Sequence, residues 1–325
     1  MRHVFVLNPA AGKSKQALAI KDQIIAYFQA HPEKEYRLCI TDGKGAATAF
    51  AEEECTQGGD IRFYACGGDG TLQEVAAGIP FGSSNVELAV LPCGSGNDFV
   101  RVFGGKENFS NLEEIIEGVA VSVDAIDSDK ATSKNTWRSL NIASIGLDAA
   151  VGYKMQRYKK WPGVSGSMAY NLAVVDTICH PIGNKMQIEI TGADGNVIKR
   201  EGKFLMAVAA NGRCYGGGYC GAPRASVNDG LLDFVLVKKI SRFQISKVLS
   251  KYKAGLHDGV DCIEHISGTS IKVATEKEVI CNVDGECFKA DRISFWVVPG
   301  AFRLVLPTSV AEEFGFLSKG EHAKV

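Results

Sequence analysis

The sequence lacks three features that would each define a broad class of proteins. Its 36 Lys and Arg residues are balanced by 37 Asp and Glu residues, so no overall field would attract nucleic acid, and we expect no nucleic-acid partner. No apolar run approaches the ~20 residues that span a bilayer. The longest candidate, Ala169–Cys179, is interrupted by Asn171 and Asp176. The first residues run directly into a structured motif, which predicts no signal peptide, so any contact with a membrane would be peripheral.

The ten cysteines lack the spacing of a metal site or a redox motif. There is no Cys-x-x-Cys, and the closest pairs, Cys214/Cys220 and Cys281/Cys287, are each six positions apart. Others, such as Cys66, lie at the end of apolar runs, where a thiol behaves as a small buried side chain. This placement predicts unpaired thiols, with neither disulfides nor metal ligands, and a reducing compartment.

The first third of the chain alternates short apolar runs with helical patterns. The predicted strands are His3–Leu7, Tyr36–Thr41, Ile61–Cys66 and Val86–Leu91, and the predicted helices are Ser14–Ala30, Lys44–Gln57 and Thr71–Gly78. Strand–helix alternation is typical of an α/β domain with a parallel sheet. Ligands of such sheets bind outside the carboxyl ends of the strands.

After about Val121 the pattern changes to short strands separated by turn dipeptides. The predicted strands are Arg138–Ala143, Lys185–Thr191, Lys203–Ala210, Leu231–Val237, Ser270–Ala274, Val279–Val283 and Ile293–Val298. This pattern favours an antiparallel sandwich or barrel, interrupted by helices near Gly166–Cys179 and Ser241–Leu256. A chain of 325 residues is too long for one core. We expect an α/β domain at 1–126, joined by the segment 308–325, and an all-β domain at 127–307.

The loop after the first predicted strand, Asn8–Ser14, contains Gly12-Lys13-Ser14. A P-loop would need a glycine five residues before Gly12, and Leu7 stands there. The loop is therefore either an anion site at a helix start or a plain turn in which Ser14 is the helix N-cap.

Two further loops are rich in glycine and contain an aspartate. Gly67–Thr71 reads Gly-Gly-Asp-Gly-Thr, and Pro92–Phe99 reads Pro-Cys-Gly-Ser-Gly-Asn-Asp-Phe. Glycines let backbone N–H groups turn toward a phosphate. A carboxylate such as Asp69 beside phosphates needs a divalent cation or a water network between them. The simpler alternative is a tight turn, with Thr71 and Glu74 forming a capping box at the next helix.

Taken together, these motifs resemble the catalytic domain of diacylglycerol kinases and their lipid-kinase relatives. Gly-Gly-Asp-Gly-Thr alone is shared with NAD kinases and phosphofructokinase-like enzymes. The resemblance extends over essentially the whole chain, through motifs such as Asn211-Gly212 and Asp284-Gly285-Glu286. It implies an α/β nucleotide-binding domain with a parallel sheet, followed by an antiparallel β-sandwich that binds the lipid, with the active site in the cleft between them.

The resemblance also implies roles for individual residues. The nucleotide-binding residues would be Asn8, Pro9, Gly12, Lys13, Thr41, Gly67, Gly68, Asp69, Gly70, Thr71, Leu72, Gln73, Ser95 and Asn97. Asp69, Asp98 and Asp124 would form a magnesium-linked acidic network with Lys13. A structural metal would lie at Ser226, Asp229 and Leu231. The catalytic residues would be Glu286, Asp284 and Asp69. Ser95 stands where threonine is usual in the family, and the hydroxyl is retained.

The implied activity is transfer of a phosphoryl group from ATP, with Mg²⁺, to the hydroxyl of a membrane lipid, with diacylglycerol the leading substrate and phosphatidic acid the product. The alternatives are a kinase for a long-chain base or ceramide-like lipid and a non-catalytic lipid-binding protein. We expect a cytoplasmic protein that contacts the inner face of the membrane. Its oligomeric state stays open, with a homodimer among the alternatives.

Two segments of the second domain keep two interpretations each. Asp284 and Glu286 form either a hairpin turn with solvated carboxylates or a catalytic pair. On a regular strand, residues two positions apart point to the same face, so the two carboxylates would lie together, with Glu286 favoured as the proton acceptor. The basic residues Lys154, Arg157, Lys159 and Lys160, followed by Trp161, form either a solvated helix face or a contact with an anionic bilayer.

Overall fold

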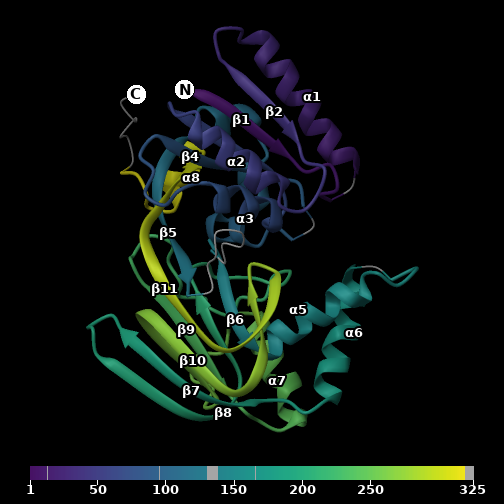
Figure 1. The fold of residues 1–325 in the computed structure, drawn as a ribbon, viewed down its shortest axis with the longest axis vertical. Helices are drawn as coiled ribbons and strands as arrows, with labels where there is room; N and C mark the ends of the chain where they lie inside the picture. Colours follow the sequence, from purple (N-terminus) through teal and green to yellow (C-terminus); the bar gives the residue numbers. More distant parts are fainter. Residues whose placement is uncertain (13, 95, 130–137, 165, 319–325) are drawn as a thin grey trace. The chain divides into compact units, whose positions relative to one another are not determined.

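The computed structural model describes residues 1–12, 14–94, 96–129, 138–164 and 166–318. The chain divides into two compact units, and both ends of the chain belong to the first. This first unit contains Met1–Ala125 and the segment from Val298 onward, and the second unit contains Ile126–Val297. Strands β5 (Val119–Ser128) and β11 (Glu286–Leu306) each include residues of both units (Figure 1). Residues 298–307, expected in the sandwich domain, thus fall in the first unit.

A parallel sheet forms the centre of the first unit. Its strand order is β2-β1-β3-β4-β11, and the pairings along that path are parallel. The first four strands are β1 (Arg2–Leu7), β2 (Tyr36–Ile40), β3 (Ile61–Gly67) and β4 (Val86–Pro92). Every residue of β3 is buried, as expected for a strand covered by helices on both faces. The sheet therefore brings the carboxyl ends of β1, β3 and β4 together at one edge.

The helices of the first unit follow the strands in sequence. They are α1 (Ser14–Ala30), α2 (Ala46–Thr56), α3 (Asp69–Gly78), α4 (Leu112–Ile116) and α8 (Thr308–Glu313), with 3₁₀ turns η1 (Phe99–Phe103) and η2 (Lys106–Phe109). Helix α1 buries Ala17, Ile24 and Phe28 on one stripe. The Phe28 ring lies edge-on to Phe5 of β1, 5.6 Å between centroids. An amphipathic helix of this kind is held mainly by such packing.

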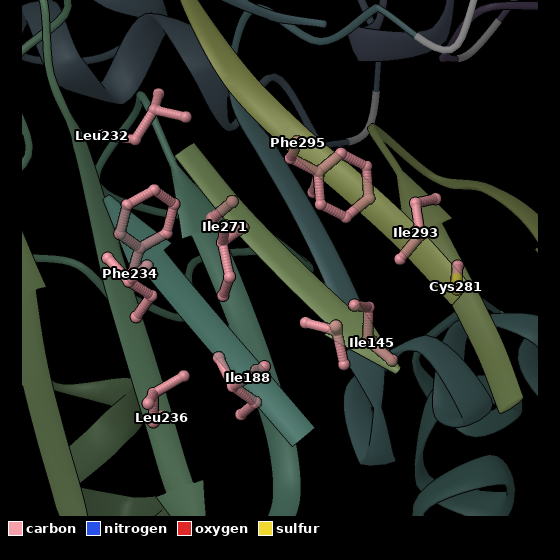
Figure 2. Packing of buried hydrophobic residues seen from close by; sticks show 14 of the residues in the cluster. Ile145, Ile188, Leu232, Phe234, Leu236, Ile271, Cys281, Ile293 and Phe295 are labelled. Atoms are coloured by element: carbon pink, nitrogen blue, oxygen red, sulfur yellow. The ribbon is translucent and has the colours of Figure 1, made fainter. Parts of the chain in front are cut away.

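An antiparallel sandwich forms the second unit. Its strands, besides parts of β5 and β11, are β6 (Ile142–Gly146), β7 (Asn184–Gly192), β8 (Val197–Ala210), β9 (Leu232–Lys238) and β10 (Ile263–Val283). Strand β10 pairs along its length with β9, β7, β6 and β11, and β8 pairs with β6, β7 and β9. Ile145, Ile188, Phe234, Ile271 and Phe295 converge in the core between these strands (Figure 2).

Three helices interrupt the sandwich: α5 (Leu147–Tyr158), α6 (Gly166–Cys179) and α7 (Arg242–Lys253). Helices α5 and α6 contact each other. Helix α7 begins after a capping box in which Ser241 and Gln244 satisfy each other's backbone N–H groups. Within the residues that the structure describes, no helix combines the length and apolar character that crossing a bilayer requires.

The fold class predicted from the sequence is confirmed: a parallel α/β unit and an antiparallel sandwich. Several details differ. The predicted strands Ser270–Ala274 and Val279–Val283 are parts of one strand, β10, which contains a register shift between them. Strand β5 was not predicted, and helix α5 agrees with one of the two interpretations of its basic residues, a helix face. The predicted capping box at Thr71 is wrong, because α3 already begins at Asp69 and its N-cap, Gly68, has no side chain to cap it.

The prediction that all cysteines are unpaired is also wrong. Cys214 and Cys220 form a disulfide, and the other eight cysteines carry thiols. The bond closes a short loop in which Gly216, Gly217 and Gly218 all have positive φ angles. Glycines in this conformation let the chain turn back sharply enough for two sulfurs six positions apart to meet.

Candidate functional site

Three loops meet at the carboxyl edge of the parallel sheet, after β1, β3 and β4. The Asn8 N–H donates to the carbonyl of Cys66 at 3.0 Å, which joins the first loop to the end of β3. The N–H groups of Cys93 and Gly94 both donate to the Gly67 carbonyl, at 2.9 and 3.1 Å, which joins the second loop to the third. The loops therefore form one backbone cluster.

Glycine is required where these loops touch. A Cβ atom on Gly94 would lie 2.3 Å from the Gly68 Cα, and one on Gly12 would lie 2.1 Å from the Cys93 carbonyl oxygen. Side chains could not fit there without moving backbone. A Cβ on Gly67 would lie 2.2 Å from Thr71 Oγ1. Because side chains are excluded there, the hydrogen-bond donors of this surface are main-chain N–H groups and the N-terminus of α3. Such donors suit phosphate oxygens.

Asp69 and Asp98 bring two carboxylates into this cluster. Asp69 lies in the first turn of α3, and its Oδ1 accepts a hydrogen bond from the Phe99 N–H at 3.2 Å. Burial, and then the nearby Asp98 carboxylate, raise the pKa of Asp69 above its usual value. Arg101 Nε donates to Asp98 Oδ1 at 3.0 Å. Two neighbouring carboxylates fit a divalent cation, which would relieve the repulsion between them.

Asp124 is held separately on β5. It is 3% exposed, and its Oδ1 accepts a hydrogen bond from the Gly300 N–H at 2.8 Å. The described part of the chain contains no group of three Asp, Glu, His or Cys side chains arranged to hold a metal ion. The predicted three-carboxylate network therefore stays a prediction. Mg²⁺ commonly takes one or two carboxylates and completes its shell with phosphate and water oxygens.

The remaining predicted nucleotide residues shape the loops or lie beside them. Asn8 Nδ2 donates to Thr71 Oγ1 at 3.1 Å, and Asn97 Nδ2 donates to the Gly94 carbonyl at 2.7 Å. Asn97 has a φ angle of 51°, a left-handed conformation that asparagine tolerates. Thr41 is buried after β2, and both its N–H and its hydroxyl donate to the Leu7 carbonyl. Pro9 and Gly70 are exposed, Leu72 is buried and Gln73 is half-buried. Lys13 and Ser95 lie outside the described residues.

A cavity of about 350 Å³ adjoins the third loop within the first unit. Helix α1 lines it with Gln16 and Gln23, the end of β4 with Pro92 and Gly94, and η2 with Lys106. The glycine loops thus have open space beside them with both polar and apolar walls.

In the second unit, Asp284 occupies the turn between β10 and β11, with a φ angle of 45°. Gly285 follows with a φ angle of 95°, so the pair forms the two-residue turn that Asp-Gly favours. The Asp284 carboxylate accepts hydrogen bonds from the N–H groups of Leu140 at 3.0 Å and Ile142 at 2.9 Å. The expectation that Asp284 and Glu286 share one face of a regular strand is therefore wrong, because Asp284 is not in a strand. Glu286 is the first residue of β11 and is half-buried.

The predicted metal loop, with Ser226, Asp229 and Leu231, lies just before β9. Asp229 Oδ1 accepts a hydrogen bond from the Leu231 N–H at 3.0 Å, and Ser226 Oγ donates to Asn228 Oδ1 at 3.0 Å. Burial, and then the Asp229 carboxylate, raise the pKa of Asp233 to about 6. A hard cation bound here would be favoured by two neighbouring carboxylates, but the metal stays a prediction.

Sequence reasoning did not single out Asp148 in the first turn of α5. Both its carboxylate oxygens are buried, and burial raises its pKa above the usual value. Its surroundings include Tyr215, whose hydroxyl lies 3.0 Å from that of Tyr252. The signal available in the sequence was an acidic residue two positions after the glycine that ends a buried strand, Gly146-Leu147-Asp148.

Comparisons with known proteins agree across both units. The family model described as "Diacylglycerol kinase catalytic domain" matches residues 2–128, and "YegS C-terminal NAD kinase beta sandwich-like domain" matches residues 141–306. The chain is 30% identical over 245 residues to a "Probable lipid kinase YegS-like" of Shewanella frigidimarina, covering 74% of this chain and 75% of that protein. It is 27% identical over 285 residues to the "Diacylglycerol kinase" of Bacillus subtilis, covering 86% and 88%.

A solved structure, that of a putative diacylglycerol kinase from Bacillus anthracis, has the same fold. It aligns with a TM-score of 0.71 and 24% sequence identity, over 95% of this chain and 98% of that one. The likeness of fold therefore extends over both units.

Proposed function

This chain belongs to the family of YegS-like lipid kinases and diacylglycerol kinases, and from that premise we propose that it transfers the γ-phosphoryl group of ATP to the hydroxyl of diacylglycerol. The observation that carries the proposal is the cluster of three loops that pack backbone to backbone and hold Asp69 beside Asp98. Among the relatives, the Bacillus subtilis protein is named for diacylglycerol.

In the proposed reaction, the lipid hydroxyl oxygen forms a bond to the γ-phosphorus as the bond from that phosphorus to the β,γ-bridging oxygen breaks. ADP leaves, and Glu286 accepts the hydroxyl proton. The N–H groups of the glycine loops and of the α3 N-terminus bind the phosphate oxygens. Mg²⁺, held by Asp69 and Asp98 together with phosphate oxygens, would supply charge neutralisation.

Asp284 has a different proposed role. Both its oxygens already accept main-chain N–H groups, so its carboxylate is less available to accept a proton from substrate. We assign it as a positioning residue that fixes the start of β11, where Glu286 lies. The two hydrogen bonds of Asp284 support Glu286 as the proposed base.

The proposal includes a cytoplasmic location at the inner face of the membrane, where a diacylglycerol would be available. Labelled ATP, Mg²⁺ and micelles containing diacylglycerol, a long-chain base or a ceramide-like lipid test the substrate. We expect label in phosphatidic acid with the wild type and none with Asp69→Asn. Label in another lipid would replace diacylglycerol as the substrate, and label in no lipid would favour a non-catalytic lipid-binding protein.

A further inference from the structure

Helix α6 exposes a stripe of large apolar side chains to solvent. Its buried stripe consists of small residues, Ala169, Ala173 and Thr177. Three of its large apolar residues face outward: Met168 is 51% exposed, Leu172 39% and Val175 60%. Positions 168, 172 and 175 have the spacing of one helix face. Large exposed apolar stripes of this kind mark interaction surfaces.

A further exposed apolar side chain lies at the start of α7, which is bonded to the end of α6. The Arg242 guanidinium donates to the carbonyls of Cys179 and His180, at 3.4 and 3.1 Å, and so holds the first residue of α7 beside the end of α6. The next residue, Phe243, is 91% exposed. We call Met168, Leu172, Val175 and Phe243 the α6–α7 face; the helices are labelled in Figure 1.

The segments before α6 and around α7 are rich in positive charge, although the chain as a whole has a net charge of -1. Residues 149–175 contain four basic residues and no acidic one, and residues 238–257 contain six basic residues and no acidic one. These basic residues are Lys154, Arg157, Lys159, Lys160, Lys238, Lys239, Arg242, Lys247, Lys251 and Lys253.

Only part of this charge is neutralised within the protein. Lys154 Nζ lies 3.2 Å from the Asp176 carboxylate. Arg157, Lys159 and Lys160 are exposed, and among the described residues none of them forms an ion pair. Trp161, 48% exposed, follows directly, with its ring edge-on to Tyr158. An exposed tryptophan beside basic side chains suits the boundary between headgroups and acyl chains.

We propose that the α6–α7 face and its basic residues are the surface by which this lipid kinase lies on an anionic bilayer. This inference rests on the proposed function, because a diacylglycerol substrate would lie in that bilayer. Apolar side chains enter the boundary between acyl chains and headgroups, and basic side chains bind lipid phosphates. A second copy of the chain does not suit this face, because two such faces would bring like charges together.

The test is binding to vesicles of phosphatidylcholine with and without phosphatidylglycerol, measured by co-sedimentation without ATP. Wild type is expected to bind the anionic vesicles and to lose binding in high salt. L172S/V175S and F243S should each weaken binding at least tenfold. The matched control is V197S on β8, because Val197 is 59% exposed but lies outside the face. It should bind like wild type.

Charge is tested separately. K159Q/K160Q should weaken binding about 25-fold, since each basic residue near an anionic surface contributes roughly fivefold. K277Q, which removes an exposed lysine of β10, should have no effect. Equal losses in V197S or K277Q, or wild-type binding by the face variants, would overturn the proposal. A wild-type dimer that L172S/V175S converts to monomer would assign the face to a second copy instead.

Kinase assays separate this proposal from the proposed function. With a short-chain, water-soluble diacylglycerol, the face variants should retain wild-type turnover, whereas turnover on vesicle-embedded diacylglycerol should fall with binding. If neither wild type nor any variant phosphorylates a lipid, the proposed function fails. The vesicle-binding comparison still shows whether the α6–α7 face binds the bilayer.

Discussion

Asp284→Asn distinguishes a positioning residue from a base. The substitution replaces a carboxylate that accepts the N–H groups of Leu140 and Ile142 with an amide that has one acceptor oxygen. Hydrogen bonds to a charged group contribute about 1.5–3 kcal/mol each, and both N–H donors belong to buried residues. Asparagine tolerates the positive φ angle of this turn. We therefore expect the free energy of unfolding to fall by about 2 kcal/mol.

Urea unfolding of Asp284→Asn, Glu286→Gln and wild type measures this difference. Asp194→Asn is the matched control, because Asp194 also precedes a glycine in a hairpin turn but bonds locally, to Asn196. We expect it to change stability by less than about 0.5 kcal/mol. Glu286→Gln should be nearly as stable as wild type and lose on the order of 10²–10⁴ in turnover.

The reasoning fails if Asp284→Asn keeps wild-type stability and still loses turnover to the extent expected of Glu286→Gln. That result would make Asp284 the proton acceptor and its two main-chain hydrogen bonds incidental. Activity of Asp284→Asn measured below its unfolding midpoint should instead fall less than that of Glu286→Gln, because the base itself is intact.

Three further predictions concern charge and cross-linking. Asp69→Asn should raise the melting temperature at neutral pH without nucleotide or Mg²⁺. The pKa of Asp69 is raised in the folded state, so ionisation of this carboxyl costs stability above its unfolded pKa. The gain should vanish in acid, where Asp69 is protonated in both states, and a constant gain at all pH values would contradict this cause. Chelation should lower the melting temperature of wild type more than that of Asp229→Ala, and equal responses would remove the loop metal. In Cys214→Ser/Cys220→Ser, the free energy of unfolding measured in urea should fall by about 2 kcal/mol, the amount expected for closing a short loop. A reductant should bring wild type to the same value. A variant as stable as wild type would show that the bond does not constrain the unfolded chain.

The sequence was sufficient to predict the parallel strands, because apolar runs such as Ile61–Cys66 stand between helical patterns. The glycine loops were equally visible, since Gly67–Thr71 combines three glycines with an aspartate. The start of helix α5 was not predicted, although a helix face was one interpretation of its basic residues Lys154 and Arg157. A local pattern also could not show that Asp284 uses its carboxylate on Leu140, which is 144 residues away in sequence.

The disulfide and the α6–α7 face were missed for the same physical reason. Spacing alone does not bring Cys214 to Cys220. The positive φ angles of the intervening glycines do. An apolar helix such as Gly166–Cys179 likewise predicts burial, and only the structure shows that Ala173 faces inward while Val175 faces solvent. Both features depend on conformation or orientation, which composition does not specify.

The place of β11 in the first sheet has a consequence for synthesis on the ribosome. Strand β4 pairs with β11 through Leu88 and Leu304, and Glu87 of β4 binds Arg303 at 2.8 Å. These partners are made roughly 200 residues after β4, which corresponds to about 10–40 s at about 5–20 residues per second. Throughout that interval the nascent sheet has an open edge, which is a template for aggregation. The order of synthesis therefore leaves this edge of the domain unpaired until the last strand is made.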